Sequence, residues 1–222
     1  MNVRAVVSVS AFLLTPLASA LTGTTTTTWD CCKPACSWTQ NAQAGGASGT
    51  VATCNINNQV LSNGASAPSA CQGGDAYSCS DFQPIIISDT LSYGFAGNWE
   101  TSNCCKCFQF TWTSGAGAGK SMIVQVVNSG GVSTGDFDIY TPGGGVGDYN
   151  ACTSQYGAPP QGWGAQYGGV SSDAECDQLP SILQPGCHWR FEWAGGGING
   201  WTTEYEEVDC PSQLTSISGC YP

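Results

Sequence analysis

Three of the fourteen cysteines of this chain lie within one nine-residue stretch, residues 28–36, which reads TWDCCKPAC. Two adjacent cysteines do not easily bridge each other, so Cys31 and Cys32 have to reach two distant parts of the chain. The backbone around Asp30 is therefore tied down from several directions. A rigidly held carboxylate is what general acid/base chemistry requires, although a knot of disulfides beside an incidental surface aspartate would give the same pattern.

The even number of cysteines permits up to seven disulfides, and the N-terminus indicates an oxidising compartment. Arg4 precedes a mostly apolar run, and residues 18–20 read Ala-Ser-Ala, which is the pattern of a secretory signal peptide. We expect residues 1–20 to be removed and residues 21–222 to form a single secreted, extracellular domain. We recognise no linker and no carbohydrate-binding module in it.

Zinc is a weaker explanation of the cysteines. The segment 104–107 is dense in sulfur, but His188 is the one histidine, and no pair of C-x-x-C knuckles has the spacing of a zinc ribbon. A single histidine without a nucleophile motif also argues against a Ser-His-Asp hydrolase. We therefore expect structural disulfides and not a zinc site.

The charge balance limits the classes of partner that the chain can bind. The chain has 16 acidic and 5 basic residues, a net charge of −11, and loss of Arg4 with the signal peptide makes it −12. Such a chain repels nucleic acids and anionic membranes. Charged residues make up only 9%, while 8 Trp and 8 Tyr are present, which is typical of a secreted protein that binds neutral sugars. Most of these aromatic residues are nevertheless expected in the core.

Alternating and β-branched patterns predict a β-rich domain with short strands and long loops. We expect strands at residues 107–112, 121–127, 136–140, 188–193 and 202–208, with shorter apolar runs at 85–87 and 91–95. Residues 171–183 favour a helix, and the threonine-rich residues 22–28 suggest an extended arm that could carry O-linked sugars. A small closed barrel is the economical way to remove so many strand edges.

Asp30 and Asp138 differ from the other acidic residues, because each is next to aromatic residues and beside a rigidifying device. The device is the cysteine cluster for Asp30 and the Pro-Gly-Gly-Gly turn at 142–145 for Asp138. Hydrolysis of a glycosidic bond needs two carboxyl groups in different protonation states. These two aspartates are the candidates, provided that the fold brings them together.

The stretch from Thr28 to Trp38 closely resembles the signature of glycoside hydrolase family 45, the fungal-type endo-β-1,4-glucanases. Residues 104–107, 137–147 and 187–193 match further motifs of the family in the same order. The resemblance covers essentially all of residues 21–222. It implies an all-β fold, a six-stranded double-psi β-barrel with long disulfide-bridged loops, a few short helices and an open groove.

The resemblance also implies roles. Asp30 is similar in position to the general base and Asp138 to the general acid of an inverting endo-1,4-β-glucanase, with carboxyl groups roughly 6.5–9.5 Å apart. Trp38 resembles the aromatic sugar platform, and Trp29 and Asp136 are further candidates for substrate binding. The expected partner is a β-1,4-glucan, either cellulose or lichenan or glucomannan, and a monomer without cofactors is expected.

The family's disulfide pairing, carried over residue by residue, uses every cysteine. It joins Cys31–Cys152, Cys32–Cys71, Cys36–Cys104, Cys54–Cys79, Cys105–Cys220, Cys107–Cys210 and Cys176–Cys187.

Three positions depart from the family pattern. Thr28 stands where many members carry tyrosine, and Val132 stands where many carry an aspartate that assists catalysis. Asp136 stands where a histidine often precedes the Phe-Asp pair. If residues 136–138 are extended, Asp136 and Asp138 point to the same side, and we predict that repulsion between them keeps Asp138 protonated.

Two other readings share the expected barrel. An expansin-like wall-loosening protein has the barrel and the Phe-Asp motif without a catalytic base on the first strand, so Asp30 argues against it. A disulfide-rich binding protein of the barwin type is the third reading.

Overall fold

The computed structural model describes residues 21–222; the expected signal peptide, residues 1–20, lies outside them. Within the described part, no helix has the length and apolar character needed to cross a membrane. The strands are β1 Leu21–Thr28, β2 Ile85–Ile86, β3 Leu91–Asn98, β4 Cys107–Trp112, β5 Ser121–Ser129, β6 Phe137–Tyr140 and β7 Trp201–Val208. The α-helices are α1 Thr39–Ala44, α2 Cys152–Tyr156, α3 Gln184–Glu192 and α4 Ser212–Ser218, and the short 3₁₀ helices are Ala35–Ser37, Ala70–Gln72, Thr101–Asn103 and Asp173–Gln178.

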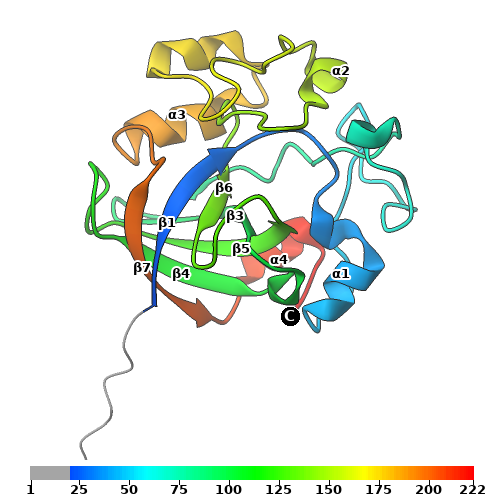
Figure 1. Cartoon of the computed structure of the whole chain (residues 1–222), viewed down its shortest axis with the longest axis horizontal. Helices are drawn as coiled ribbons and strands as arrows, with labels where there is room; N and C mark the ends of the chain where they lie inside the picture. Colours follow the sequence, from blue (N-terminus) through cyan, green and yellow to red (C-terminus); the bar gives the residue numbers. More distant parts are fainter. Residues whose placement is uncertain (1–20) are drawn as a thin grey trace, which may run out of the picture.

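Six strands close into a barrel in the order β3-β5-β4-β7-β1-β6, because β6 also pairs with β3. Two of the pairings, β1 with β6 and β3 with β5, are parallel, and the others around the barrel are antiparallel. Closure removes the unpaired strand edges that short strands would otherwise expose. The expected six-stranded double-psi β-barrel is confirmed, with the helices and long loops arranged around it (Figure 1).

The barrel interior is filled by aromatic side chains from alternate strand positions. Phe110 of β4 stacks on Phe137 of β6 with ring centroids 5.5 Å apart, and Tyr205 of β7 meets Phe137 edge-on at 5.1 Å. All three are buried. The outward residues of β7, including Glu204 and Glu206, are exposed as the alternation predicts. This core fixes which face of β1 and β6 is left for the groove.

Seven disulfides fasten the loops to the barrel, and no cysteine of the described chain is free. They are the seven pairs that the family resemblance implies: Cys31–Cys152, Cys32–Cys71, Cys36–Cys104, Cys54–Cys79, Cys105–Cys220, Cys107–Cys210 and Cys176–Cys187. Loops that bury few apolar residues gain most from such closure, at about 2–4 kcal/mol per bridge.

The threonine-rich segment is a barrel strand and not an arm. It forms β1 between β7 and β6, and Thr25 and Thr27 are buried. The Thr25 hydroxyl donates to the carbonyl oxygen of Ile198 at 2.7 Å and accepts from the indole N–H of Trp112 at 3.0 Å. These two threonines are therefore closed to glycosylation. Threonine suits the position because its branched side chain fits a strand while its hydroxyl supplies a buried polar contact.

The expected strand at 188–193 is wrong, because these residues belong mainly to α3. Trp189 and Trp193 are four residues apart and stack with centroids at 5.5 Å, so the helical period and not the alternation describes them. The Pro-Gly pair at 185–186, just after the segment expected to be helical, lies in the first turn of α3, where proline is tolerated. The helix expected at 171–183 is limited to the 3₁₀ segment Asp173–Gln178.

Candidate active site

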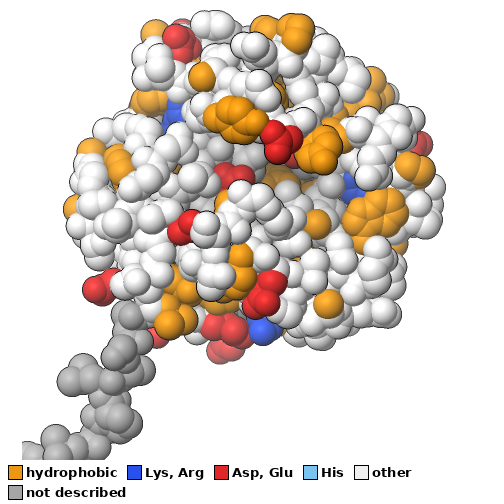
Figure 2. Space-filling model, in the orientation of Figure 1, with side chains coloured by type: hydrophobic (Ala, Val, Ile, Leu, Met, Phe, Trp, Pro, Cys, Tyr) orange, Lys and Arg blue, Asp and Glu red, His pale blue; other side chains and the backbone are white. Residues whose placement is uncertain are grey.

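An open groove of about 960 Å³ crosses the outer face of β1 and β6. The view in Figure 2 shows a hollowed face, with acidic side chains in and beside the hollow and hydrophobic side chains along its rim. The groove is lined by residues from β1, the cysteine-rich stretch after it, the loop before β6, and the loop between β6 and α2. Its lining includes Asp30, Trp38, Asp136 and Asp138, so the fold brings these four predicted site residues together.

Asp138 is positioned by the parallel pairing of β1 and β6. Thr26 lies opposite Asp138 in this register, and its hydroxyl donates to Asp138 Oδ1 at 2.8 Å. Because Phe137 and Ile139 point into the barrel core and are buried, the strand alternation turns Asp138 toward the groove. The core packing of β6 therefore orients the carboxyl group.

Asp30 lies two residues after the end of β1, where the chain is held on both sides. Its Oδ1 accepts the backbone N–H of Cys32 at 2.8 Å, and its carbonyl oxygen accepts the N–H of Ala151 at 2.8 Å. Cys31 adopts a positive φ of 60°, an uncommon conformation for a residue with a side chain, and is bonded to Cys152. These contacts support the expectation that the cysteine cluster fixes the backbone at Asp30.

Burial shifts the protonation of both carboxyl groups in the same direction. It raises the pKa of Asp30 to about 7, against a stabilising hydrogen bond from the Cys32 N–H, and the charge of Asp138 adds to the increase. It raises the pKa of Asp138 to about 6, with the Thr26 hydrogen bond acting in the opposite sense. The two groups therefore titrate near neutral pH as an interacting pair, which is the range that acid/base catalysis needs.

Asp136 is engaged differently from our expectation. It precedes β6 in a turn closed by its N–H on Ser133, and its Oδ1 accepts both the N–H and the hydroxyl of Thr24, at 2.9 and 2.8 Å. Burial raises the pKa of Asp138 and the Thr26 hydrogen bond lowers it, so repulsion from Asp136 is not the cause. Asp136 lines the groove, and its contact with substrate stays a prediction.

The two tryptophans expected to bind sugar lie in different environments. Trp38 lines the groove and is partly exposed. Trp29 is 2% exposed, is absent from the groove lining, and packs edge-on against Tyr140 with centroids 6.0 Å apart. The substrate-binding role of Trp29 is therefore corrected: its ring is part of the core beneath Asp30 and has no surface to offer a sugar.

Lys33 is a groove residue that the sequence did not single out. It is buried, its Nζ lies 3.2 Å from the ring centroid of Trp38, and it donates to the carbonyl oxygens of Ala65 and Ala67 at 3.3 and 2.9 Å. Burial lowers its pKa to about 8. A cation held against the ring face fixes the orientation of Trp38. Its place in the Cys-Cys-Lys-Pro sequence was the available signal.

The two loops on either side of α2 supply a second aromatic rim. Tyr149 and Tyr167 line the groove and are largely exposed, and the hydroxyl of Tyr167 donates to Asp148 at 2.5 Å. The loop after α2 is held by the buried guanidinium of Arg190, which donates to the carbonyl oxygens of Gly168, at 2.9 Å, and Val170. In the sequence, only the Pro-Gly-Gly-Gly turn drew attention to this region. No local pattern indicates that the two tyrosines line the same groove as Trp38.

The two other departures from the family pattern both lie on the groove. Thr28 and Val132 line it, so the positions where many members carry tyrosine and aspartate are groove positions in this fold. Neither side chain offers an aromatic face or a carboxylate. Contacts of those kinds are lost at these two places.

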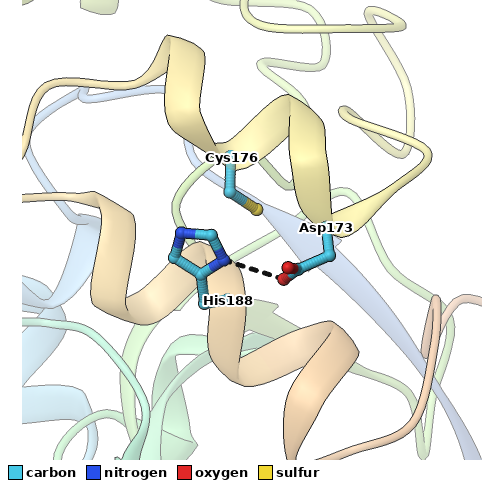
Figure 3. A group of neighbouring side chains, drawn as sticks. All are labelled: Asp173, Cys176 and His188. Atoms are coloured by element: carbon cyan, nitrogen blue, oxygen red, sulfur yellow. Dashed lines mark hydrogen bonds and ion pairs between the residues drawn. The ribbon is translucent and has the colours of Figure 1, made fainter.

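A separate cluster joins the 3₁₀ helix Asp173–Gln178 to α3, away from the groove lining. Figure 3 shows Asp173, Cys176 and His188 together, with His188 Nδ1 2.8 Å from Asp173 Oδ1. The three have the residue types and proximity of metal ligands, but the Cys176 sulfur is bonded to Cys187. A disulfide sulfur is not a thiolate ligand, so the donor set does not fit structural zinc. His188 acts as a surface contact between the two helices.

Known proteins resemble this chain over most of its length. Residues 22–221 match the sequence profile of Glycosyl hydrolase family 45. An endoglucanase of Cryptopygus antarcticus is 44% identical over 213 residues, which cover 92% of each chain. A relative from Fusarium oxysporum is also 44% identical, over 91% of this chain, but this chain spans only 54% of its length.

The fold agrees with a solved structure. The crystal structure of a cellulase from the Antarctic springtail Cryptopygus antarcticus superposes with a TM-score of 0.84 at 42% sequence identity, covering 92% of this chain and 98% of that one. The family profile, the relatives and the solved structure agree with the groove and its two carboxyl groups in indicating a glycoside hydrolase. The chain therefore belongs to glycosyl hydrolase family 45.

Proposed function

We propose that this chain is a secreted endo-β-1,4-glucanase that cleaves internal bonds of β-1,4-glucans with inversion, with Asp30 as general base and Asp138 as general acid. The observation that carries the proposal is the pair of partly enclosed carboxyl groups on one open groove, each held by its own hydrogen bond. The endoglucanase names of the relatives support the substrate class.

In the proposed reaction, Asp138 donates its proton to the glycosidic oxygen as the bond from this oxygen to the anomeric carbon breaks. A water on the opposite face of the sugar attacks that carbon and gives its proton to the Asp30 carboxylate. Asp30 ends protonated and Asp138 ionised, and solvent restores both. The productive enzyme therefore has Asp30 ionised and Asp138 protonated.

The groove suits a neutral polymer. An open cleft of about 960 Å³ accommodates several sugar units and leaves both ends of the polymer outside. Trp38, Tyr149 and Tyr167 offer ring faces for sugar C–H groups, while Asn128 and Asn199 offer polar groups for hydroxyls. Cellulose, lichenan and glucomannan share the required backbone, and the groove itself does not rank them.

The test is a reducing-end assay on a soluble β-1,4-glucan, with NMR detection of the first-formed anomer. We expect new reducing ends, a rapid fall in viscosity from internal cleavage, and α-anomeric product from the β-linkage. Cleavage with β-anomeric product would overturn the roles of the two aspartates. No reducing ends, together with polymer binding, would favour the expansin-like alternative.

A further inference from the structure

Asp148 is an acidic residue of the groove to which the proposed mechanism gives no role. It lies in the loop between β6 and α2, and its Oδ1 accepts the hydroxyl of Tyr167 at 2.5 Å. Tyr167 lies in the loop after α2, and both residues line the groove. The bond therefore ties together two loops that reach the groove from either side of α2.

The main chain of Tyr167 is fixed independently of this bond. Gly145, in the loop after β6, lies opposite Tyr167 in an antiparallel bridge. The carbonyl oxygen of Gly145 also accepts the N–H of Trp29 at 2.7 Å, and Trp29 directly precedes Asp30. Backbone pairing therefore fixes the main chain of Tyr167 relative to the proposed catalytic base.

The side chain of Tyr167 is much less restrained than its backbone. It is 68% exposed, and its hydroxyl makes one hydrogen bond among the described residues, the bond to Asp148. An exposed ring that a ligand has to order on binding lowers the affinity by the entropy lost from its side-chain torsions. The bond to Asp148 orders the Tyr167 ring before a sugar arrives.

The chemistry of the pair suits this task. An ionised carboxylate is a strong acceptor, and O–H donors approach it to about 2.5–2.7 Å. The hydrogen bond to Asp148, and then the negative charge of Asp148, raise the pKa of Tyr167, so the phenol stays neutral. Both side chains are exposed, and exposed polar pairs contribute little to fold stability. The main effect of the bond is therefore on the position of the ring.

We infer that Asp148 is a positioning residue for substrate binding, whose carboxylate holds the Tyr167 ring in the orientation that stacks on a sugar of the bound glucan. The inference deepens the proposed function and rests on it, because a β-1,4-glucan is the polymer that the groove then holds. Direct contact of the Asp148 carboxylate with a sugar hydroxyl is the alternative role, and the experiment below separates the two.

The inferred role predicts which kinetic constant changes. A sugar stacks its C–H face on an aromatic ring, so the ring has to present its flat face. Tyr167 takes no part in proton transfer, and it holds the sugar equally in the ground state and in the transition state. Loss of this uniform binding raises KM and leaves kcat unchanged.

The test is a double-mutant cycle with Asp148→Ala and Tyr167→Phe, each of which removes one partner of the bond and keeps the ring. We expect either variant to raise KM on a soluble β-glucan about fourfold, with kcat within about twofold. The double variant should show the same rise of about fourfold, because both changes remove one interaction. Additive effects, about sixteenfold in the double variant, or an unchanged KM in the single variants, would overturn the inference.

Two further variants separate positioning from a general loosening of the loops. Asp148→Asn keeps an oxygen that accepts the phenol proton, so its KM should stay within about twofold of wild type. Tyr156→Phe is the matched control, because the Tyr156 hydroxyl donates to Asn58 at 2.9 Å from α2 but does not line the groove. It should leave KM unchanged. An Asp148→Asn variant as impaired as Asp148→Ala, or a raised KM in Tyr156→Phe, would contradict the inferred role.

An NMR titration of the tyrosine rings examines the bond without catalysis. The Tyr167 signal, assigned by its loss in Tyr167→Phe, should titrate above the usual pKa of tyrosine in wild type and return toward it in Asp148→Ala. Equal pKa values in the two proteins would show that the bond is absent. If wild type fails to hydrolyse the glucan, the proposed function fails; if it hydrolyses and Asp148→Ala leaves KM unchanged, only this inference fails.

Discussion

The hydrogen bond from Thr26 to Asp138 gives the most direct test of which aspartate is the acid. The Thr26 hydroxyl donates to Asp138 Oδ1 at 2.8 Å, which stabilises the ionised carboxylate and lowers its pKa against the larger effect of burial. Thr26→Val removes the hydroxyl while keeping the branched shape that suits β1. The pKa of Asp138 should therefore rise.

The size of the effect follows from the bond. A hydrogen bond to a charged group contributes about 1.5–3 kcal/mol. Because Asp138 is partly exposed to the groove, we take about 1.4 kcal/mol, which corresponds to a change of about one in the pKa of Asp138. If Asp138 is the acid, alkaline-limb activity is proportional to its protonated fraction. Thr26→Val should then raise kcat/KM about tenfold at each pH on that limb and leave the acid limb, set by Asp30, unchanged.

The assay measures kcat/KM on a soluble β-glucan from about pH 4 to about pH 9, a range that brackets both pKa values. Thr26→Ser is the control, because it keeps the hydroxyl. Wild type and Thr26→Ser should superpose. A Thr26→Val profile whose acid limb moves while its alkaline limb stays fixed would reverse the two roles. A profile unchanged on both limbs, in a protein with wild-type melting temperature, would refute the reasoning from this hydrogen bond.

Four further outcomes are expected. Asp138→Asn should abolish hydrolysis while glucan oligosaccharides still bind by calorimetry, because an amide cannot donate the proton; near wild-type turnover would contradict the assignment. The raised pKa of Asp30 means that the contribution of this group to native stability is fully present below pH ~4 and is lost as pH rises through about 7, so Asp30→Asn should recover about 2 kcal/mol at pH 8 in urea unfolding; equal unfolding free energies of wild type and variant at pH 8 would refute it. Lys33→Met should raise KM about fivefold with little change in kcat, because Trp38 loses the cation that orients it; an unchanged KM would show that the ring holds itself. Alkylation of the folded protein should label no thiol, and reduction should unfold it; a labelled cysteine would show that a bridge is missing.

The sequence by itself determined the parts of the protein that depend on local pattern or on a specific motif. The strands at 107–112 and 202–208 follow from alternation, and the structure confirms them with ends shifted by at most one residue. Asp30 stood out because three cysteines closely follow it, and Asp138 because of its aromatic neighbours and the Pro-Gly-Gly-Gly turn after it. These signals are local, so a linear reading finds them.

The tertiary structure decided the features that depend on contacts between distant segments. The segment at 188–193 alternates like a strand, yet the stacking of Trp189 on Trp193 and the anchoring of Arg190 make it a helix. The threonines of residues 22–28 form a barrel strand because β6 and β7 pair on either side of them. Over six or seven residues, local preference is too weak to outweigh such packing.

The candidate site shows the same division. Residue patterns named Asp30 and Asp138 and the family resemblance added Trp38, but the sequence also offered Trp29 as a sugar contact and Asp136 as the partner of Asp138. Burial of Trp29 and the pairing of Asp136 with Thr24 emerge only when β1 and β6 lie side by side. Desolvation and hydrogen bonding depend on neighbours that the linear sequence does not place, which is why only the tertiary structure decided these points.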